Sequence, residues 1–201
     1  MGPPLLRHRY TGLVVKGIRD FEIIYEDVFS LKALMIHMRE WLIQEGFANR
    51  DDHTFEETLY LQRNSPQGKT IHIRWRVNKM MDNKAGLFYH HIDIDFHIKG
   101  MQEVEFMHQG QKIKAEKGEL KLLIGGKLII DRDNIWGGHQ RLGRYSKFLI
   151  NGLFRLKHEA QIVEVAQDTE KFNAAIKEHL NIHSFFSKQS QDFWAKRPGA
   201  N

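Results

Sequence analysis

Nearly strict alternation of apolar and polar residues in two segments constrains the fold of this chain more than any other feature. The alternation extends from Thr70 to Val77 and, over a longer stretch, from Leu87 to Lys99. A period of two residues is that of a β-strand, in which successive side chains point to opposite faces of the sheet. Both segments are therefore predicted to be strands that bury one face and keep the other polar.

The two faces of segment 87–99 differ in their chemistry. The apolar face is formed by Phe88, Ile92, Ile94, Phe96 and Ile98, and the polar face by Tyr89, His91, Asp93, Asp95 and His97. Histidines and carboxylates at this spacing can share a metal ion when a third ligand comes from elsewhere. However, Arg74 and Arg76 can pair with Asp93 and Asp95 across an antiparallel ladder. We therefore predict an exposed ladder of salt bridges here, and no metal site.

A helix and several further strands are expected around these two segments. Ser30 can cap a helix that Gly46 ends, and the residues between them repeat with the helical period. Strands are also expected at 13–16, 21–29, 55–63, 103–107, 112–116, 120–124 and 127–130, the last two joined by a Gly125-Gly126 hairpin turn. From about Arg141 to Leu180 the helical period returns, with an interruption at Gly152 and a bend or break near 167–170.

This order predicts an α+β fold in which a curved antiparallel sheet carries an N-terminal helix and a long C-terminal helix. Since no linker or internal repeat interrupts the pattern, residues 13–182 are expected to form a single domain. A flexible basic N-terminus, residues 1–12, precedes this domain, and an aromatic tail, residues 183–201, follows it. The large side chains of the tail are expected to fold back over the core or to dock on a protein partner or a membrane; they are Phe185, Phe186, Phe193 and Trp194.

The order of elements resembles the helix-grip fold of START-like ligand-binding proteins. The resemblance lies in this order alone and extends over most of the chain. It implies a cavity between the sheet and the final helix that holds an apolar small molecule or a lipid. The side chains expected to line this cavity are Tyr60, Trp75, Phe88, His90, Ile92, Ile94 and Phe96, with Tyr60 and His90 as polar contacts.

Positive charge is concentrated in one part of the chain. Residues 134–158 contain five lysines and arginines and no acidic residue, whereas basic and acidic residues balance elsewhere and the formal net charge is +5. The predicted anion-binding residues are Arg141, Arg144, Lys147, Arg155 and His158; on a helical wheel the leucines of this segment, together with Ala160, fall on the opposite side and are expected to face the sheet. Such a basic face can bind RNA phosphates or an anionic lipid surface, or it can simply be solvated.

No catalytic motif is found in the chain. There is no cysteine, no H-E-x-x-H and no G-x-S-x-G sequence. The glycines of segment 137–145 imitate a phosphate-binding loop, but Arg144 and Tyr145 occupy the places where such a loop needs Lys and Ser or Thr. We therefore predict no catalytic residue and no cofactor.

The predicted function is that of a non-enzymatic binding domain for an apolar small molecule or lipid. The alternative is an RNA- or ribosome-associated protein that binds polyanions through residues 141–158. A cytoplasmic location is expected because the sequence shows no signal-peptide pattern and no apolar run long enough to span a membrane.

Overall fold

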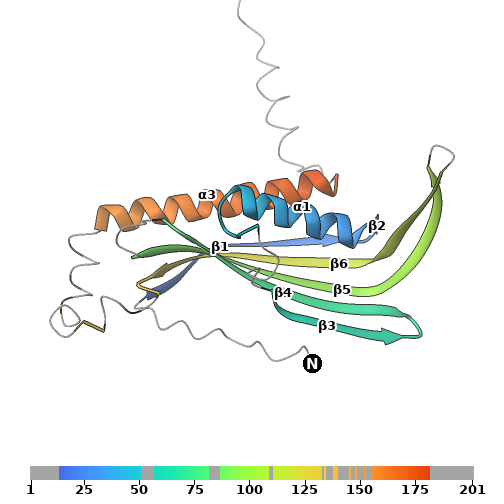
Figure 1. Cartoon of the computed structure of the whole chain (residues 1–201), viewed down its shortest axis with the longest axis horizontal. Coiled ribbons are helices and arrows are strands. Elements are labelled where there is room, and N and C mark those ends of the chain that lie inside the picture. Colours follow the sequence, from blue (N-terminus) through green and yellow to red (C-terminus); the bar gives the residue numbers. More distant parts are fainter. Residues whose placement is uncertain are drawn as a thin grey trace, which may run out of the picture.

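The computed structural model confirms the predicted α+β architecture. It describes residues 14–50, 57–81, 87–108, 111–132, 134, 138–139, 145, 148, 152 and 155–181. A curved antiparallel sheet of six strands carries the helices α1 and α3 on one face, in the arrangement of a helix-grip-like fold (Figure 1). The elements are β1 (Val14–Tyr25), β2 (Val28–Phe29), α1 (Leu31–Gln44), β3 (Glu57–Ser65), β4 (Gly68–Met80), β5 (Phe88–His108), β6 (Gln111–Ile130) and α3 (Arg155–His179).

The sheet is built around two long strands. Its order is β1-β6-β5-β4-β3, with the short β2 also beside β6, and all pairings are antiparallel. β5 has 21 residues and β6 has 20, so each takes in segments that were predicted as separate strands. β1 and β3 are the edge strands. The alternation of 70–77 and 87–99 is confirmed as the pairing of β4 with β5.

The predicted Gly125-Gly126 hairpin is wrong. Both glycines lie inside β6, where Gly125 pairs with Asp93 and Gly126 pairs with Ile92. Position 126 requires glycine because the sheet and α3 are closely packed there: a Cβ added at Gly126 would lie only 2.2 Å from Thr169 Oγ1 of α3. A glycine pair within a strand can therefore mark the approach of a helix as well as a turn.

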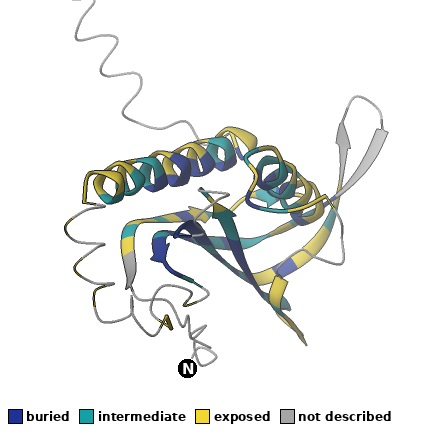
Figure 2. Cartoon of the chain, turned by 60° about the vertical axis from the view of Figure 1, so that its left-hand side comes forward, coloured by how far each residue is buried: buried dark blue, intermediate teal, exposed yellow. Residues whose placement is uncertain are grey.

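Helix α1 forms as its local sequence predicts. The side chain of Ser30 accepts a hydrogen bond from Ala33 N at 3.3 Å, and Gly46 takes a φ of +79° after the last turn. Its buried residues are Leu31, Leu34, Met38 and Leu42. They pack on the apolar face of β4, β5 and β6, so the main core lies between the helices and the sheet (Figure 2).

Helix α3 is continuous through residues 167–170, where a bend or break was expected. Its inner side carries Val165, Asp168, Thr169, Phe172, Asn173 and Ile176. The expectation that Leu156 and Ala160 face the sheet is wrong, since both are exposed. Leu156 precedes Val165 by two and a half helical turns, which places it on the opposite side of the helix.

Candidate functional site

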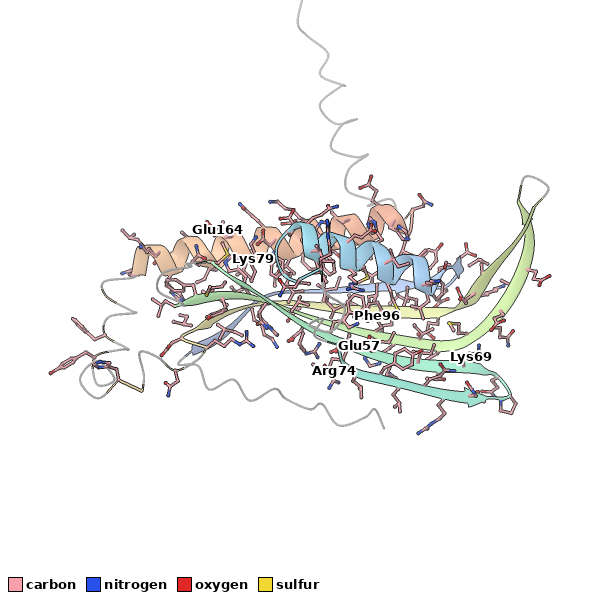
Figure 3. All side chains as sticks on the ribbon, in the orientation of Figure 1. Glu57, Lys69, Arg74, Lys79, Phe96 and Glu164 are labelled. Carbon is pink, nitrogen blue, oxygen red and sulfur yellow. The ribbon has the colours of Figure 1, made fainter. Side chains whose placement is uncertain are left out.

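A groove opens between α1 and the part of the sheet formed by β3 and β4. Its volume is about 470 Å³. The floor is formed by Ile71 and Trp75 of β4 and Met101 of β5, and one wall by Met35 and Ile36 of α1. The remaining lining residues are Leu31, Lys32, Arg39, Glu57, Tyr60, Gln62, Lys69 and Glu116 (Figure 3, where Glu57 and Lys69 are labelled). We call this hollow the α1 groove.

The acidic side chains of the α1 groove are engaged by protein donors. Trp75 Nε1 donates to Glu57 Oε2 at 3.0 Å, and Leu31 N at the start of α1 donates to Glu116 Oε2 at 3.2 Å. Lys69 pairs with Glu103 outside the groove at 2.8 Å, and this hydrogen bond raises the pKa of Lys69. These contacts fix the charged rim and leave an apolar floor beneath it.

Two of the seven predicted cavity residues line this groove. They are Tyr60, which is half exposed, and Trp75, which is almost fully buried. The other five, Phe88, His90, Ile92, Ile94 and Phe96, are buried beneath or beside the helices and do not border the groove. The cavity was expected beneath the final helix, whereas the α1 groove lies on the far side of the N-terminal helix.

Several of the predicted cavity residues pack against α3. Ile92, Ile94 and Phe96 belong to one buried cluster with Phe172 and Ile176 of α3. Phe88 belongs to a second cluster with Val165. Among the described residues, these apolar side chains of α3 therefore lie where the resemblance places a ligand.

A buried polar cluster joins α3 to the sheet. The ring of His90 is 0% exposed, with Nδ1 3.2 Å from Asp168 Oδ2 and Nε2 2.9 Å from Gln161 Oε1. Burial alone would raise the pKa of Asp168, but the hydrogen bond from His90 and the charge of Lys79, 3.8 Å away, outweigh it and hold that pKa below its ordinary value.

His90 was predicted as a polar contact, whereas Asp168 and Gln161 were not predicted as site residues. The available signal was the irregular stripe near 167–170, where Asp168 and Thr169 interrupt the apolar side of α3. Asp168 lies 78 residues from His90 in the sequence, so no local pattern pairs them. The cluster is closed to solvent at His90 and fixes the position of α3 on the sheet.

The face of the sheet that points away from the helices carries an ion-pair network. The predicted pairing is confirmed: Arg74 lies 3.0 Å from Asp95, and Arg76 lies 2.9 Å from Asp93 and 2.7 Å from Asp95. Both arginines are buried, so the ladder is less exposed than predicted. Burial would raise the pKa of Asp93, but hydrogen bonds from His91 and Lys127 and the charge of Arg76 hold it far below its usual range.

The histidines and carboxylates of this polar face form separate pairs and do not converge on a common point. His91 contacts Asp93 and Asn78, and His97 Nδ1 lies 3.1 Å from His72 Nδ1. Within the part of the chain that the structure describes, no group of three or more potential metal ligands comes together. The absence of a metal site remains a prediction.

Most of the predicted anion-binding residues lie outside the described residues, namely Arg141, Arg144 and Lys147. Arg155 is exposed and pairs with Glu159 of the next helical turn at 3.0 Å. His158 is half-buried and lies three residues after Arg155, so the two are neighbours on the surface of α3. Anion binding by all five residues stays a prediction.

Comparison with known proteins shows a distant likeness to a solved structure. No protein-family model matches the chain, and no curated protein matches it either. Among solved structures, the di-domain ARO/CYC StfQ from the steffimycin biosynthetic pathway is 11% identical, with a TM-score of 0.18. The match covers 81% of this chain and 52% of that chain, so this chain spans about half the length of the matched protein. A likeness at this level carries no argument about the site.

Proposed function

We propose that this domain binds a small, largely apolar molecule in the α1 groove. The observation that supports this most is the size and floor of the groove, about 470 Å³ over Ile71, Trp75 and Met101. Ligand pockets of proteins are typically concave and mostly apolar, with volumes of about 300–1,000 Å³. The flat indole of Trp75 and the flexible thioethers of Met35 and Met101 suit an aromatic or acyl group.

The rim of the groove gives such a ligand an orientation. Lys32 and Arg39 of α1 bring positive charge to one side, and the hydroxyl of Tyr60 stands on the other. Glu57 and Glu116 are already hydrogen-bonded to Trp75 and Leu31. A polar or anionic end of the ligand is therefore expected at the helix side of the groove, with its apolar body over the floor.

A groove-filling substitution tests this proposal. Met35→Trp places a larger side chain in the groove, whereas Ile24→Trp adds the same residue at an exposed position of β1 outside it. In a titration with Nile red, a neutral apolar dye, the unmodified protein should bind saturably with one dye per chain. Met35→Trp should weaken binding by roughly tenfold or more, as expected when apolar contact area is lost.

Two results separate the outcomes of this titration. Ile24→Trp should bind the dye like the unmodified protein and keep its melting temperature, because Ile24 is exposed. Met35 is partly buried against the core, so the melting temperature of Met35→Trp is measured as well, to show that the variant is folded when its affinity is compared. If Met35→Trp binds Nile red as tightly as Ile24→Trp does, the dye enters elsewhere and the groove is not the ligand site.

A further inference from the structure

The first half of α3 exposes apolar side chains that the core does not use. Leu156 is 81% exposed and Val163 is 55% exposed. They are seven residues apart and therefore share one side of the helix, about 10 Å from each other, with Ala160 between them. The inner side of the same helix is already apolar through Ile162 and Val165. Leu156, Ala160 and Val163 thus take no part in the packing of α3 on the sheet.

Two aromatic residues preceding α3 are exposed as well. Tyr145 is 62% exposed and Phe148 is 75% exposed. A single exposed apolar residue needs no explanation, but four large ones within nineteen residues of sequence form an unusual concentration.

Positive charge accompanies these apolar residues. Arg155 and Lys157 flank Leu156 and are both exposed, and Arg155 pairs with Glu159 of the next helical turn at 3.0 Å. Residues 134–158, which include Tyr145 and Phe148, hold five lysines and arginines and no acid. Apolar side chains beside lysine and arginine are typical of segments that bind the interface of a membrane, where the apolar groups insert and the cations meet anionic headgroups.

We propose that the α3 docking surface, defined as Arg155, Leu156, Lys157, Ala160 and Val163, binds an anionic lipid bilayer. Basic residues and exposed aromatics also suit single-stranded RNA, whose bases stack on aromatic rings. Leu156 and Val163 decide between the two partners, because aliphatic side chains offer no stacking surface for a base but insert well between acyl chains. No helix in the described part of the chain is long and apolar enough to cross a membrane. This binding is independent of the α1 groove.

Vesicle co-sedimentation tests the proposal on the full chain. The protein should bind vesicles of phosphatidylcholine with phosphatidylserine and bind phosphatidylcholine alone much more weakly, with the difference shrinking as salt is added. Leu156→Ser with Val163→Ser should weaken binding roughly tenfold or more, because the inserted aliphatic groups are lost. Arg155→Gln with Lys157→Gln should also weaken it roughly tenfold or more, at about fivefold for each cation removed.

Matched controls place the same changes elsewhere. Ile24→Ser with Met80→Ser removes exposed apolar surface from strands, and Arg63→Gln with Lys99→Gln removes two exposed cations from strands, away from the docking surface. Both double variants should bind vesicles like the unmodified protein. Equal loss in the controls would overturn the proposal, and so would the absence of binding to anionic vesicles at low salt. Tight binding of a single-stranded RNA that Leu156→Ser with Val163→Ser leaves unchanged, without vesicle binding, would assign this region to nucleic acid instead.

Discussion

Gly126 shows how a single residue sets the distance between a helix and the sheet. It sits inside β6, and an added Cβ would meet Thr169 of α3 at 2.2 Å from Oγ1 and 3.1 Å from the Thr169 Cβ. The hydroxyl of Thr169 donates to Val165 O of its own helix, so this side chain is held in place and cannot swing away without losing that bond. Gly126 is therefore required by contact rather than by backbone conformation.

Gly126→Ala should lower the free energy of unfolding by about 1–3 kcal/mol, the usual cost of overpacking a core. Thr169→Ala in the same chain should restore much of the loss, because it removes the atom that clashes first. Gly17→Ala in β1 is the matched control, since a Cβ there meets nothing within 4 Å. Urea unfolding measures all four proteins; if Gly126→Ala costs no more than Gly17→Ala, α3 does not approach β6 this closely.

At the scale of elements, two aromatic contacts join α1 to α3. Trp41 packs on Phe172 with ring centroids 4.8 Å apart, and His37 stacks on His179 with centroids 4.5 Å apart. His179 keeps an exposed surface, but the partial burial of its ring and the neighbouring ring of His37 lower its pKa. The stacked pair therefore favours the neutral form of His179 in the folded protein.

This contact should make stability fall in mild acid. A histidine whose pKa is lower in the folded than in the unfolded state stabilises the fold above about pH 6.5, and that contribution is lost as the pH falls through the folded pKa. The melting temperature of the unmodified protein should therefore fall between pH 7.5 and pH 5. The melting temperature of His179→Gln should fall less over the same range, because this variant lacks the titrating ring. His91 and His97, whose pKa values burial also lowers, remain in both proteins and set the shared part of the slope. Identical slopes in the two proteins would contradict a titrating contact between the helices.

Elements with local signals were predictable from the sequence, and those that depend on distant contacts were not. Ser30 and Gly46 mark the ends of α1 by their own chemistry, so its bounds followed directly. Gly125-Gly126 carries the same signal as a turn, whereas its pairing with β5 and the contact of Gly126 with Thr169 depend on distant parts of the chain. Asp168 gave the appearance of a break in α3 because its partner, His90, is 78 residues away.

At the scale of the whole molecule, the sheet offers one apolar face and the two helices cover it unequally. Side chains of α3 fill the space above the centre of β5 and β6, whereas β3 and β4 extend beyond α1 toward the free edge (Figure 1). The sheet and its helices could be predicted, because the alternation of apolar and polar residues marks the strands and the capping residue Ser30 marks the start of α1. The order of elements did not predict the α1 groove, because the position of a groove depends on which side chains fill the space between distant elements.

The central claim is that an apolar molecule enters the α1 groove, and the indole N–H signals of the four tryptophans test it most directly. Trp75 Nε1–H donates to Glu57 within the groove, whereas Trp41 packs on Phe172 at the other side of α1. In ¹H–¹⁵N NMR spectra of the protein titrated with Nile red, the Trp75 indole signal should shift progressively and saturate, and the Trp41 signal should stay in place. Saturable binding that shifts Trp41 and leaves Trp75 unmoved would contradict the account and place the ligand beneath α3.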